Sequence, residues 1–268
     1  MKTINYAFNR IDRRHTYILV VDTETANTLT YSDDKGKEQM DMSNVLFYDF
    51  GGIVADTAGN VYERFSLVNA DIYLRERELM QSAYYANKLP LYADGLKNGS
   101  RSMMTTLGMK FYIQRLCEAY GIKIACAHNA RFDKNALDTT LRYVTKSEYR
   151  YFMPYGVEWW DTMKMARSVI HNMPTYRTFC EEHDLLTANG RLSTTAENLY
   201  RFIIKDVDFV ESHTGLEDVE IEFSIMRYCY RQHKPMEKKL FKNDFPIIEN
   251  TPFQIALLRS IKENPVIF

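Results

Sequence analysis

The stretch YILVVDTET, residues 17–25, decides the fold of this chain. Its first five residues are apolar and rich in β-branched side chains, so they predict a short strand that is buried on both faces. The run ends at Asp22, and Glu24 follows two positions later. Because side chains alternate between the two faces of a strand, both carboxylates are expected on the same face. We therefore predict a central strand that brings two acids to one point.

These two acids indicate a metal site. Carboxylates held close together raise each other's pKa unless a cation lies between them, so the arrangement favours a divalent metal. The same Asp-x-Glu spacing occurs at Asp218 and Glu220, where a helix makes it ordinary. An isolated copy would be interpreted as a solvated charge pair. The position of Asp22 and Glu24 at the end of a buried strand is what favours the metal.

Two more strands are predicted at residues 45–54 and 61–69, separated by a tight turn that contains Gly59 and Asn60. With the first strand they form an antiparallel meander. The polar residues 31–43 that precede this pair are interpreted as an exposed loop.

After the meander the apolar residues take up helical spacing. This pattern covers residues 72–120, and Gly121 is expected to end its last helix. A strand at residues 122–127 follows, so the order of elements indicates a mixed α/β fold. Residues 1–233 are expected to form the main domain and residues 234–268 a C-terminal tail or small docking appendage. The next helix is predicted from apolar residues on one face, namely Phe132, Ala136, Leu137, Leu141 and Val144. Later helices are predicted at residues 162–170, 175–183, 195–204 and 215–232, with a short helix candidate at residues 252–262.

Composition limits the classes of function. The chain has 268 residues, of which 46% are hydrophobic, so it can bury a sizeable core. Its 34 basic and 35 acidic residues lack the strongly basic balance of extended nucleic-acid binders, and any such site should be local. We expect no membrane span and no secretory signal, and hence a cytoplasmic location, in a bacterial or virus-infected cell. The four cysteines are widely spaced and are predicted to be buried free thiols.

A second motif, HNARFD at residues 128–133, lies where a strand passes into a helix. Asn129 is predicted to cap the helix, which places Asp133 in the first turn, where the helix dipole favours a negative charge. Dipole compensation alone would explain Asp133 if the motif stood by itself. His128 is interpreted as a residue that bonds either substrate or, with greater weight, a neighbouring backbone group.

A third motif, SHTGLED at residues 212–218, precedes a strongly amphipathic helix. Thr214 and Glu217 match a capping box, which explains Glu217 structurally and leaves Asp218 for another role. His213 lies just before the helix, and a near-neutral pKa suits a group that takes a proton from water. A single histidine in this place would more often be an ordinary surface residue.

Taken in order, the three motifs resemble those of the DEDD exonucleases, in their DnaQ-like, histidine-containing (DEDDh) branch. The matching positions are residues 22–25, residues 128–133, and His213 followed by Asp218, within a span of residues 17–232. Each motif is short, but the ordered set is specific. The resemblance implies a ribonuclease-H-like α/β fold, whose mixed central sheet is flanked by helices and has a three-strand antiparallel meander followed by parallel strands.

The resemblance further implies a 3′→5′ exonuclease that releases nucleoside 5′-monophosphates from the 3′ end of single-stranded nucleic acid, with DNA favoured. Such enzymes use two Mg²⁺ or Mn²⁺ ions about 3.5 to 4 Å apart, and His213 would act as general base. The implied catalytic residues are Asp22, Glu24, Asp133, His213 and Asp218, of which the four acids bind metal. The implied substrate-binding residues are Thr25, Ala26, Asn27, His128 and Asn129.

Two alternatives stay open at this point. The same catalytic residues would serve a 3′ exoribonuclease, because DNA and RNA present the same phosphodiester. A non-catalytic, polymerase-associated binding module of the same fold is less favoured, since all four acids and the histidine are present. A proofreading role would imply a DNA polymerase or replication complex as partner, and the sequence does not indicate an oligomeric state.

Overall fold

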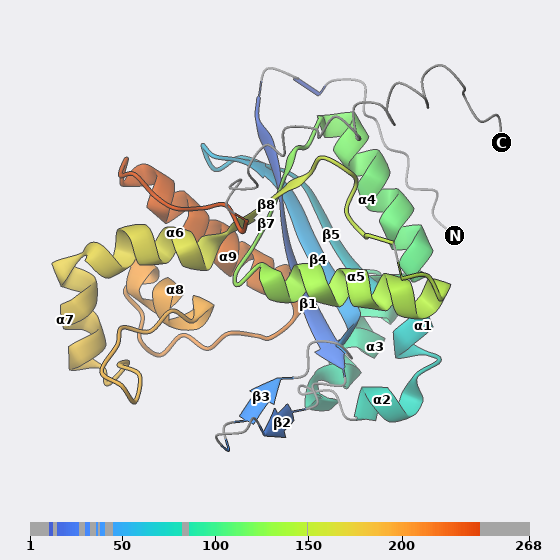
Figure 1. The fold of residues 1–268 in the computed structure, drawn as a ribbon, viewed down its shortest axis with the longest axis horizontal. Coiled ribbons are helices and arrows are strands. Elements are labelled where there is room, and N and C mark those ends of the chain that lie inside the picture. The colour runs from blue at the N-terminus through green and yellow to red at the C-terminus, as the bar shows by residue number, and fades with distance from the viewer. Residues whose placement is uncertain are drawn as a thin grey trace, which may run out of the picture.

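In the computed structural model of the chain, six strands form one mixed sheet that lies between two layers of helices (Figure 1). The structure describes residues 11–12, 15–26, 30–32, 36, 38–40, 45–81, 86–148 and 150–241. The strands of the sheet, in spatial order, are β6 (Ser102–Met104), β5 (Val61–Asn69), β4 (Leu46–Asp56), β1 (Tyr17–Ala26), β7 (Ile124–Ala127) and β8 (Glu158–Asp161).

The predicted fold is confirmed. Strands β1, β4 and β5 form the antiparallel meander, in which Tyr17 pairs with Asp56 and Glu24 with Asp49. Strand β7 runs parallel to β1, and β8 runs parallel to β7. The carboxyl ends of β1, β7 and β8 therefore lie along one edge of the sheet, where side chains and helix starts that follow these strands can meet.

The helices alternate with or follow the strands. Those predicted at residues 162–170, 175–183, 195–204 and 215–232 are confirmed to within two residues, and Gly121 ends a helix with φ 67°. The helices are α1 (Ala70–Tyr73), α2 (Arg77–Gln81), α3 (Leu89–Asn98), α4 (Thr106–Tyr120), α5 (Arg131–Thr145), α6 (Thr162–Val169), α7 (Pro174–Glu182), α8 (Ala196–Ile204) and α9 (Gly215–Arg231), with short 3₁₀ turns at Ala86–Lys88 and Ile170–Asn172.

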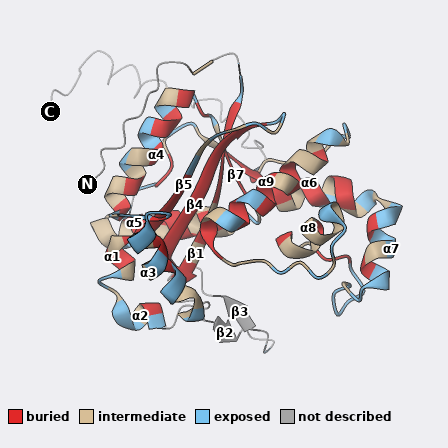
Figure 2. Ribbon diagram, turned by 180° about the vertical axis from the view of Figure 1, so that it is seen from behind, coloured by how far each residue is buried: buried red, intermediate tan, exposed pale blue. Residues whose placement is uncertain are grey.

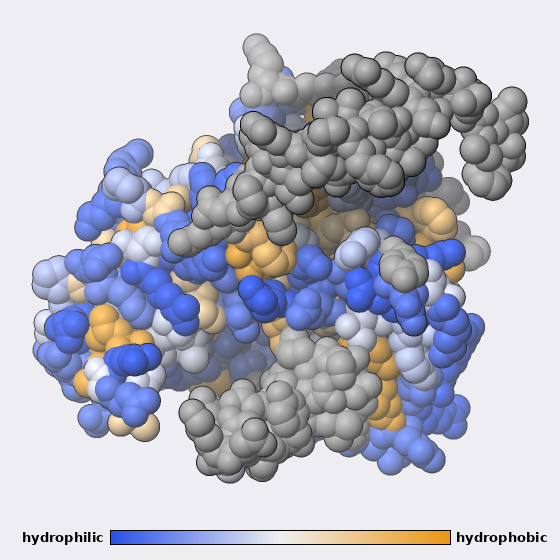
Figure 3. Space-filling model, viewed as in Figure 1, coloured by the Kyte–Doolittle hydropathy of each residue, from blue (hydrophilic) through white to orange (hydrophobic). Residues whose placement is uncertain are grey.

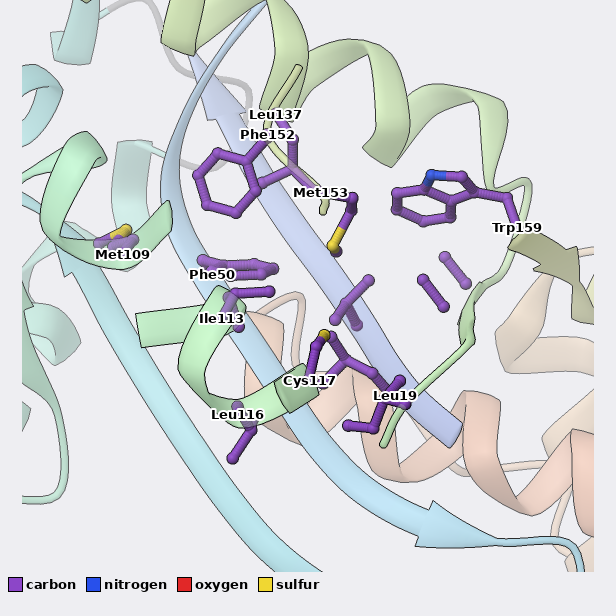
Figure 4. Packing of buried hydrophobic residues seen from close by; sticks show 14 of the residues in the cluster. Leu19, Phe50, Met109, Ile113, Leu116, Cys117, Leu137, Phe152, Met153 and Trp159 are labelled. Carbon is purple, nitrogen blue, oxygen red and sulfur yellow. The ribbon is translucent and has the colours of Figure 1, made fainter. Parts of the chain in front are cut away.

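Strand β1 is buried on both faces, as its composition predicted. Leu19 and Val21 pack with α4 and α5 on one face, and Figure 4 shows Leu19 among residues of α4 and β8. Ile18 and Val20 pack with α6 to α9 on the other face. Figure 2 shows these strands as the buried centre of the molecule. Burial of each such side chain contributes about 1.5 to 3 kcal/mol to folding, so β1 is a fixed support for the residues that follow Val21.

Several short elements were not predicted. Strand β8 has four residues and β6 has three, too few to show an alternating pattern. The segment predicted as an exposed loop at residues 31–43 contains a small hairpin of β2 (Thr30–Ser32) and β3 (Glu38–Met40). Its residues are polar, so the pairing of these strands has no hydrophobic signature in the sequence.

Part of the predicted C-terminal appendage packs on the main sheet. The backbone N–H of Leu240 donates to the carbonyl of Trp159 at 2.8 Å, and that of Asp161 donates to Lys238 at 2.8 Å. Leu240 is buried in the core beside α5. The division of the chain at residue 233 stays a prediction, and the helix predicted at residues 252–262 lies outside the described residues.

The structure buries all four cysteines as free thiols. None of the helices in the described part of the chain is long and apolar enough to cross a membrane. The face seen in Figure 3 is mostly hydrophilic where it is described, and its hydrophobic side chains form separate patches.

Candidate active site

Three acids that are distant in the sequence meet beside the carboxyl-terminal half of β1. Asp22 and Glu24 project from that strand, and Asp218 comes from the first turn of α9. Each of the three offers a carboxylate oxygen, and these oxygens all lie within 4.8 Å of one another. Asp22 and Glu24 are partly exposed, whereas Asp218 is buried. The group is thus open to solvent from the side of the strand.

Asp133 joins the same strand from α5. Its Oδ1 accepts a hydrogen bond from the backbone N–H of Thr23 at 3.1 Å and another from the Thr23 hydroxyl at 2.9 Å. The residue is 1% exposed. Compensation of the helix dipole does not explain this contact, because the carboxylate binds the strand between the two acids of the first motif. These two hydrogen bonds therefore hold the start of α5 against β1, next to Asp22.

The start of α9 lies directly against β4. The backbone N–H of Gly215 donates to Asp49 Oδ2 at 2.9 Å. At Gly51 a Cβ would lie 2.1 Å from the carbonyl carbon of Gly215, so only glycine permits this approach. Asp49 is paired in register with Glu24. This contact between α9 and β4 fixes the distance from Asp218 to the acids of β1.

Asp49 is the centre of a buried network that sequence reasoning missed. Its Oδ2 also accepts from the Tyr92 hydroxyl at 2.9 Å and from the Arg101 guanidinium at 3.3 Å. Arg101 is 8% exposed and forms a second ion pair with Glu217 at 3.1 Å. One signal was present, because Asp49 is a charged residue in the middle of an apolar strand, and such a residue must find partners.

Burial and mutual repulsion raise the pKa values of these acids. Burial is the largest cause for Asp22, followed by the charges of Glu222 and Asp133. Burial and then the charge of Asp218 raise the pKa of Glu24 to about 9. No ion pair between described residues reaches any of these carboxylates. An all-oxygen donor set without a positive side chain fits a hard divalent cation such as Mg²⁺ or Mn²⁺.

Comparison with known proteins adds to this geometry. No family model and no curated protein sequence matches this chain. A full-length 3′-exonuclease has a similar structure, with a TM-score of 0.52, 12% identity, and coverage of 87% of this chain and 93% of that one. A 3′-exonuclease that recognises the histone mRNA stem-loop at its 3′ end gives a TM-score of 0.50 at 12% identity, covering 88% of this chain and 74% of that one. The chain has the fold of the 3′-exonucleases.

A zinc-bound complex of E. coli exonuclease I with single-stranded DNA is similar at a lower level. Its TM-score is 0.44 at 14% identity, and the match covers 82% of this chain and 42% of that one. This chain therefore spans less than half the length of exonuclease I.

The histidine of the third motif lies beside the acids of this exonuclease fold, within a second group. Its Nδ1 is 3.9 Å from Glu211 Oε2, and His213, Glu197 and Glu211 have ligand atoms within 4.8 Å of one another. The backbone of His213 is left-handed, with φ 53°, which is uncommon for a residue other than glycine. The charge of Glu211 raises the pKa of Asp218, so the two groups are neighbours.

The imidazole ring of His128 forms hydrogen bonds to other parts of the protein. Its Nδ1 is 2.8 Å from the hydroxyl of Thr162, and its Nε2 is 2.7 Å from the carbonyl of Thr194. Burial lowers the pKa of the imidazole, which favours its neutral form. Both ring nitrogens are used within the protein, so the structure supports the backbone contact that the sequence favoured and gives no support to a substrate contact.

The predicted cap at Asn129 is wrong. Helix α5 begins after Ala130, and Asn129 has a left-handed backbone with φ 60°. Its carbonyl accepts the N–H of Phe132 at 2.8 Å, and its own N–H donates to Asp161 at 3.1 Å. The turn before α5 is therefore closed by one backbone hydrogen bond and by the Asp161 carboxylate, although Asp133 still falls in the first turn as predicted.

The capping box at α9 is only partly correct. Thr214 is the N-cap residue, but its side chain makes no hydrogen bond to the helix backbone. Its hydroxyl instead donates to the Glu217 carboxylate at 2.7 Å. Glu217 also pairs with Arg101 and stays apart from the acids of β1, in agreement with its predicted structural role.

The predicted substrate contacts after the first motif differ in their environments. Thr25 and Ala26 are buried, and Ala26 packs in a small core with Leu46 and Tyr48. Asn27 lies outside the described residues. The side chain of Ala26 is thus part of the core and is not available to a ligand.

Glu222 is a further buried acid on α9 that sequence reasoning missed. It lies one helical turn after Asp218 and is 3% exposed. Its Oε2 is buried without a hydrogen-bond partner. The spacing of four residues from Asp218 was a signal, because it places both side chains on one face of a helix.

Proposed function

We propose that this protein is a metal-dependent 3′→5′ exonuclease that hydrolyses the terminal phosphodiester bond of single-stranded nucleic acid. The observation that carries this proposal is the meeting of acids from β1, α5 and α9 within the fold of the 3′-exonucleases. Residues 1–233 would form the catalytic domain.

In this proposal Asp22, Glu24, Asp133 and Asp218 hold two divalent cations, Mg²⁺ or Mn²⁺. When bound, such a pair of cations lowers the pKa of an attacking water and stabilises the charge on the leaving 3′ oxygen. Bound cations would offset the repulsion among these buried carboxylates. Thr23 contributes by fixing Asp133 through two hydrogen bonds.

His213 is the proposed general base. It lies on the turn before α9, and its pKa is lowered first by burial and then by the charge of Lys88, so the neutral imidazole that can accept a proton is favoured. To reach a water at the metal site, the ring must move from its place beside Glu211.

The substrate class is the finer part of the proposal, with single-stranded DNA favoured over RNA. One experiment tests both the activity and the class: 5′-labelled single-stranded DNA and RNA of the same sequence are incubated with the protein in Mg²⁺ or EDTA. We expect a ladder that shortens from the 3′ end, with nucleoside 5′-monophosphates as products, faster on DNA and absent in EDTA.

The matched variants are Asp22→Asn, which removes one carboxylate of the site, and Asp94→Asn, whose carboxylate is exposed on α3 beside Lys97. Loss of one ligand should reduce cleavage by about 100-fold or more, and the second variant should keep normal activity. Equal activity of the Asp22→Asn variant and the wild type would refute the proposed function.

A further inference from the structure

Glu222 is a buried carboxylate that the roles proposed above leave unused. It lies on α9 four residues after Asp218, so both side chains lie on one buried face of the helix. Only 3% of its surface is exposed, and its Oε2 has no hydrogen-bond partner. Buried carboxylate oxygens in folded proteins almost always have a partner, and this one therefore needs an explanation.

The surroundings of Glu222 are negative. The charges that raise its pKa come first from Asp133 and then from Asp218 and Glu211, after the effect of burial. In turn, Glu222 raises the pKa of Asp22 more than any other charge does, ahead of Asp133 and Glu24. The charged side chains that act on the Glu222 carboxylate are thus other acids, namely Asp133, Asp218 and Glu211.

The position of Glu222 differs from that of the three acids with adjacent oxygens. Glu24 and Asp218 belong to the group whose oxygens all lie within 4.8 Å, whereas Glu222 and Asp133 fall outside it. Both of the latter act on Asp22 and on each other. The ligand atoms of Asp22, Asp133 and Glu222 do not form a group within 4.8 Å, so these three acids would reach one cation only if a water lay between them and it.

We propose that Glu222 is a fifth carboxylate of the metal site, and that its free oxygen binds, through a water, a divalent cation that Asp22 and Asp133 hold. This inference rests on the proposed function, because it requires that the acids bind metal. It explains why a buried oxygen without a donor is kept in a group of like charges.

A structural role is the competing explanation. The backbone N–H of His128 lies against the Glu222 carboxylate, which helps to lower its pKa, so Glu222 could act only as an anchor for the turn between β7 and α5. The two roles differ in their consequences. An anchor stabilises the metal-free protein, whereas a fifth ligand destabilises the metal-free protein by repulsion and stabilises the metal-bound one.

The experiment compares Glu222→Gln with Glu220→Gln, a control on the same helix whose exposed carboxylate pairs with Arg64. Thermal unfolding of the full chain is measured in EDTA and in Mn²⁺, and the affinity for Mn²⁺ is measured by calorimetry. We expect Glu222→Gln to unfold at a higher temperature than the wild type in EDTA and to bind Mn²⁺ about 10-fold more weakly. The control should match the wild type in both measurements.

The outcomes distinguish a metal ligand from a structural anchor. If Glu222→Gln binds Mn²⁺ as the wild type does and is less stable in EDTA, Glu222 is an anchor and the inference is overturned while the proposed function stands. If the wild type itself does not bind Mn²⁺, the metal-dependent function fails and the inference fails with it. Should Glu222→Gln not fold, Glu222→Asp replaces it, since a shorter carboxylate keeps the charge but withdraws the oxygen, and unchanged Mn²⁺ affinity would again overturn the inference.

Discussion

Asp22 is the residue on which the site is centred. Its carboxylate lies next to those of Glu24 and Asp218, and the charges of Glu222 and Asp133 raise its pKa. It is partly exposed, whereas Asp133, Asp218 and Glu222 are buried. In the proposed function, a substrate phosphate would therefore approach past Asp22, and the buried acids would hold the cations from behind.

Replacement of His213 by alanine should separate proton transfer from binding. The imidazole has no charge to offer the phosphate when it is neutral, so substrate affinity should change little. General acid–base catalysis contributes about 100- to 10,000-fold to the rate, and we expect kcat to fall within that range with KM nearly unchanged. Steady-state kinetics on a single-stranded DNA oligonucleotide measure both constants.

His233→Ala is the matched control, because His233 is an exposed histidine with a similar left-handed backbone at the end of α9. A His213→Ala variant with normal kcat, or one that loses only affinity, would exclude the role of general base.

The sequence predicted the acids of the three motifs as candidate site residues, but it did not predict the roles of Glu222 and Asp49. The alternation of a strand places Asp22 and Glu24 on one face with no further information. Helix α9 is different, because it carries several acids, and Glu220 among them is exposed. Spacing alone does not tell which acid of such a helix turns inward, since that depends on how the helix packs on the sheet.

Among the elements, β4 and α9 set the geometry of the site through a single close contact. The helix starts on top of Gly51, and Asp49 accepts a hydrogen bond from the first residue of the helix. Because Asp218 is only three residues further along, a small shift of the helix start moves its carboxylate away from β1. The position of Asp218 therefore depends on how the first turn of α9 packs on β4.

Gly51→Ala tests this support. The added Cβ would lie 2.1 Å from backbone atoms of Gly215, and a backbone segment cannot relax as a flexible side chain does. We expect a loss of about 1 to 3 kcal/mol of folding free energy and a larger relative loss of nuclease activity, because α9 must move. Urea denaturation and the cleavage assay measure the two effects.

Gly108→Ala in α4 serves as the control, because the atoms nearest to its Cβ belong to the side chains of Met104 in β6 and of Thr105, the N-cap residue. It should keep normal activity. If Gly51→Ala were as stable and active as Gly108→Ala, the close packing of α9 on β4 would not be what positions Asp218.

The long elements were predictable and the short ones were not. Helices α5 and α9 have apolar residues at regular helical spacing over four turns or more, which gives a clear pattern. Strand β8 has only Trp159 and Trp160 between two acids, and its identity depends on pairing with β7. The prediction of Asn129 as a helix cap is wrong because Asn129 has a left-handed backbone, which a side-chain cap residue does not have.

For the molecule as a whole, the raised pKa values link stability to pH. A carboxyl group with a folded pKa above its unfolded value keeps its proton on folding, so both states are protonated at low pH and the penalty appears as pH rises. The window extends from the ordinary carboxyl range at about 4 to the pKa of Glu24 at about 9. The metal-free protein should therefore lose stability as pH rises through this window.

Bound Mg²⁺ or Mn²⁺ should reverse this trend, because the cations replace the protons that the acids release. The measurement is thermal unfolding from about pH 5 to about pH 9, in EDTA and in Mn²⁺. We expect the two curves to agree at the acidic end and to separate as pH rises. Parallel curves over the whole range would show that the acids are not the metal ligands.

Residues 238–240, which pair with β8, affect whether this strand can pair with another molecule. An open outer strand presents unpaired peptide groups, which can pair with the same strand of another chain. Here Lys239 is bridged in antiparallel fashion to Trp160, and Leu240 bonds to Trp159, so those peptide groups are occupied from within. A chain cut before residue 238 would expose the peptide groups of this edge, and with them a surface prone to self-aggregation.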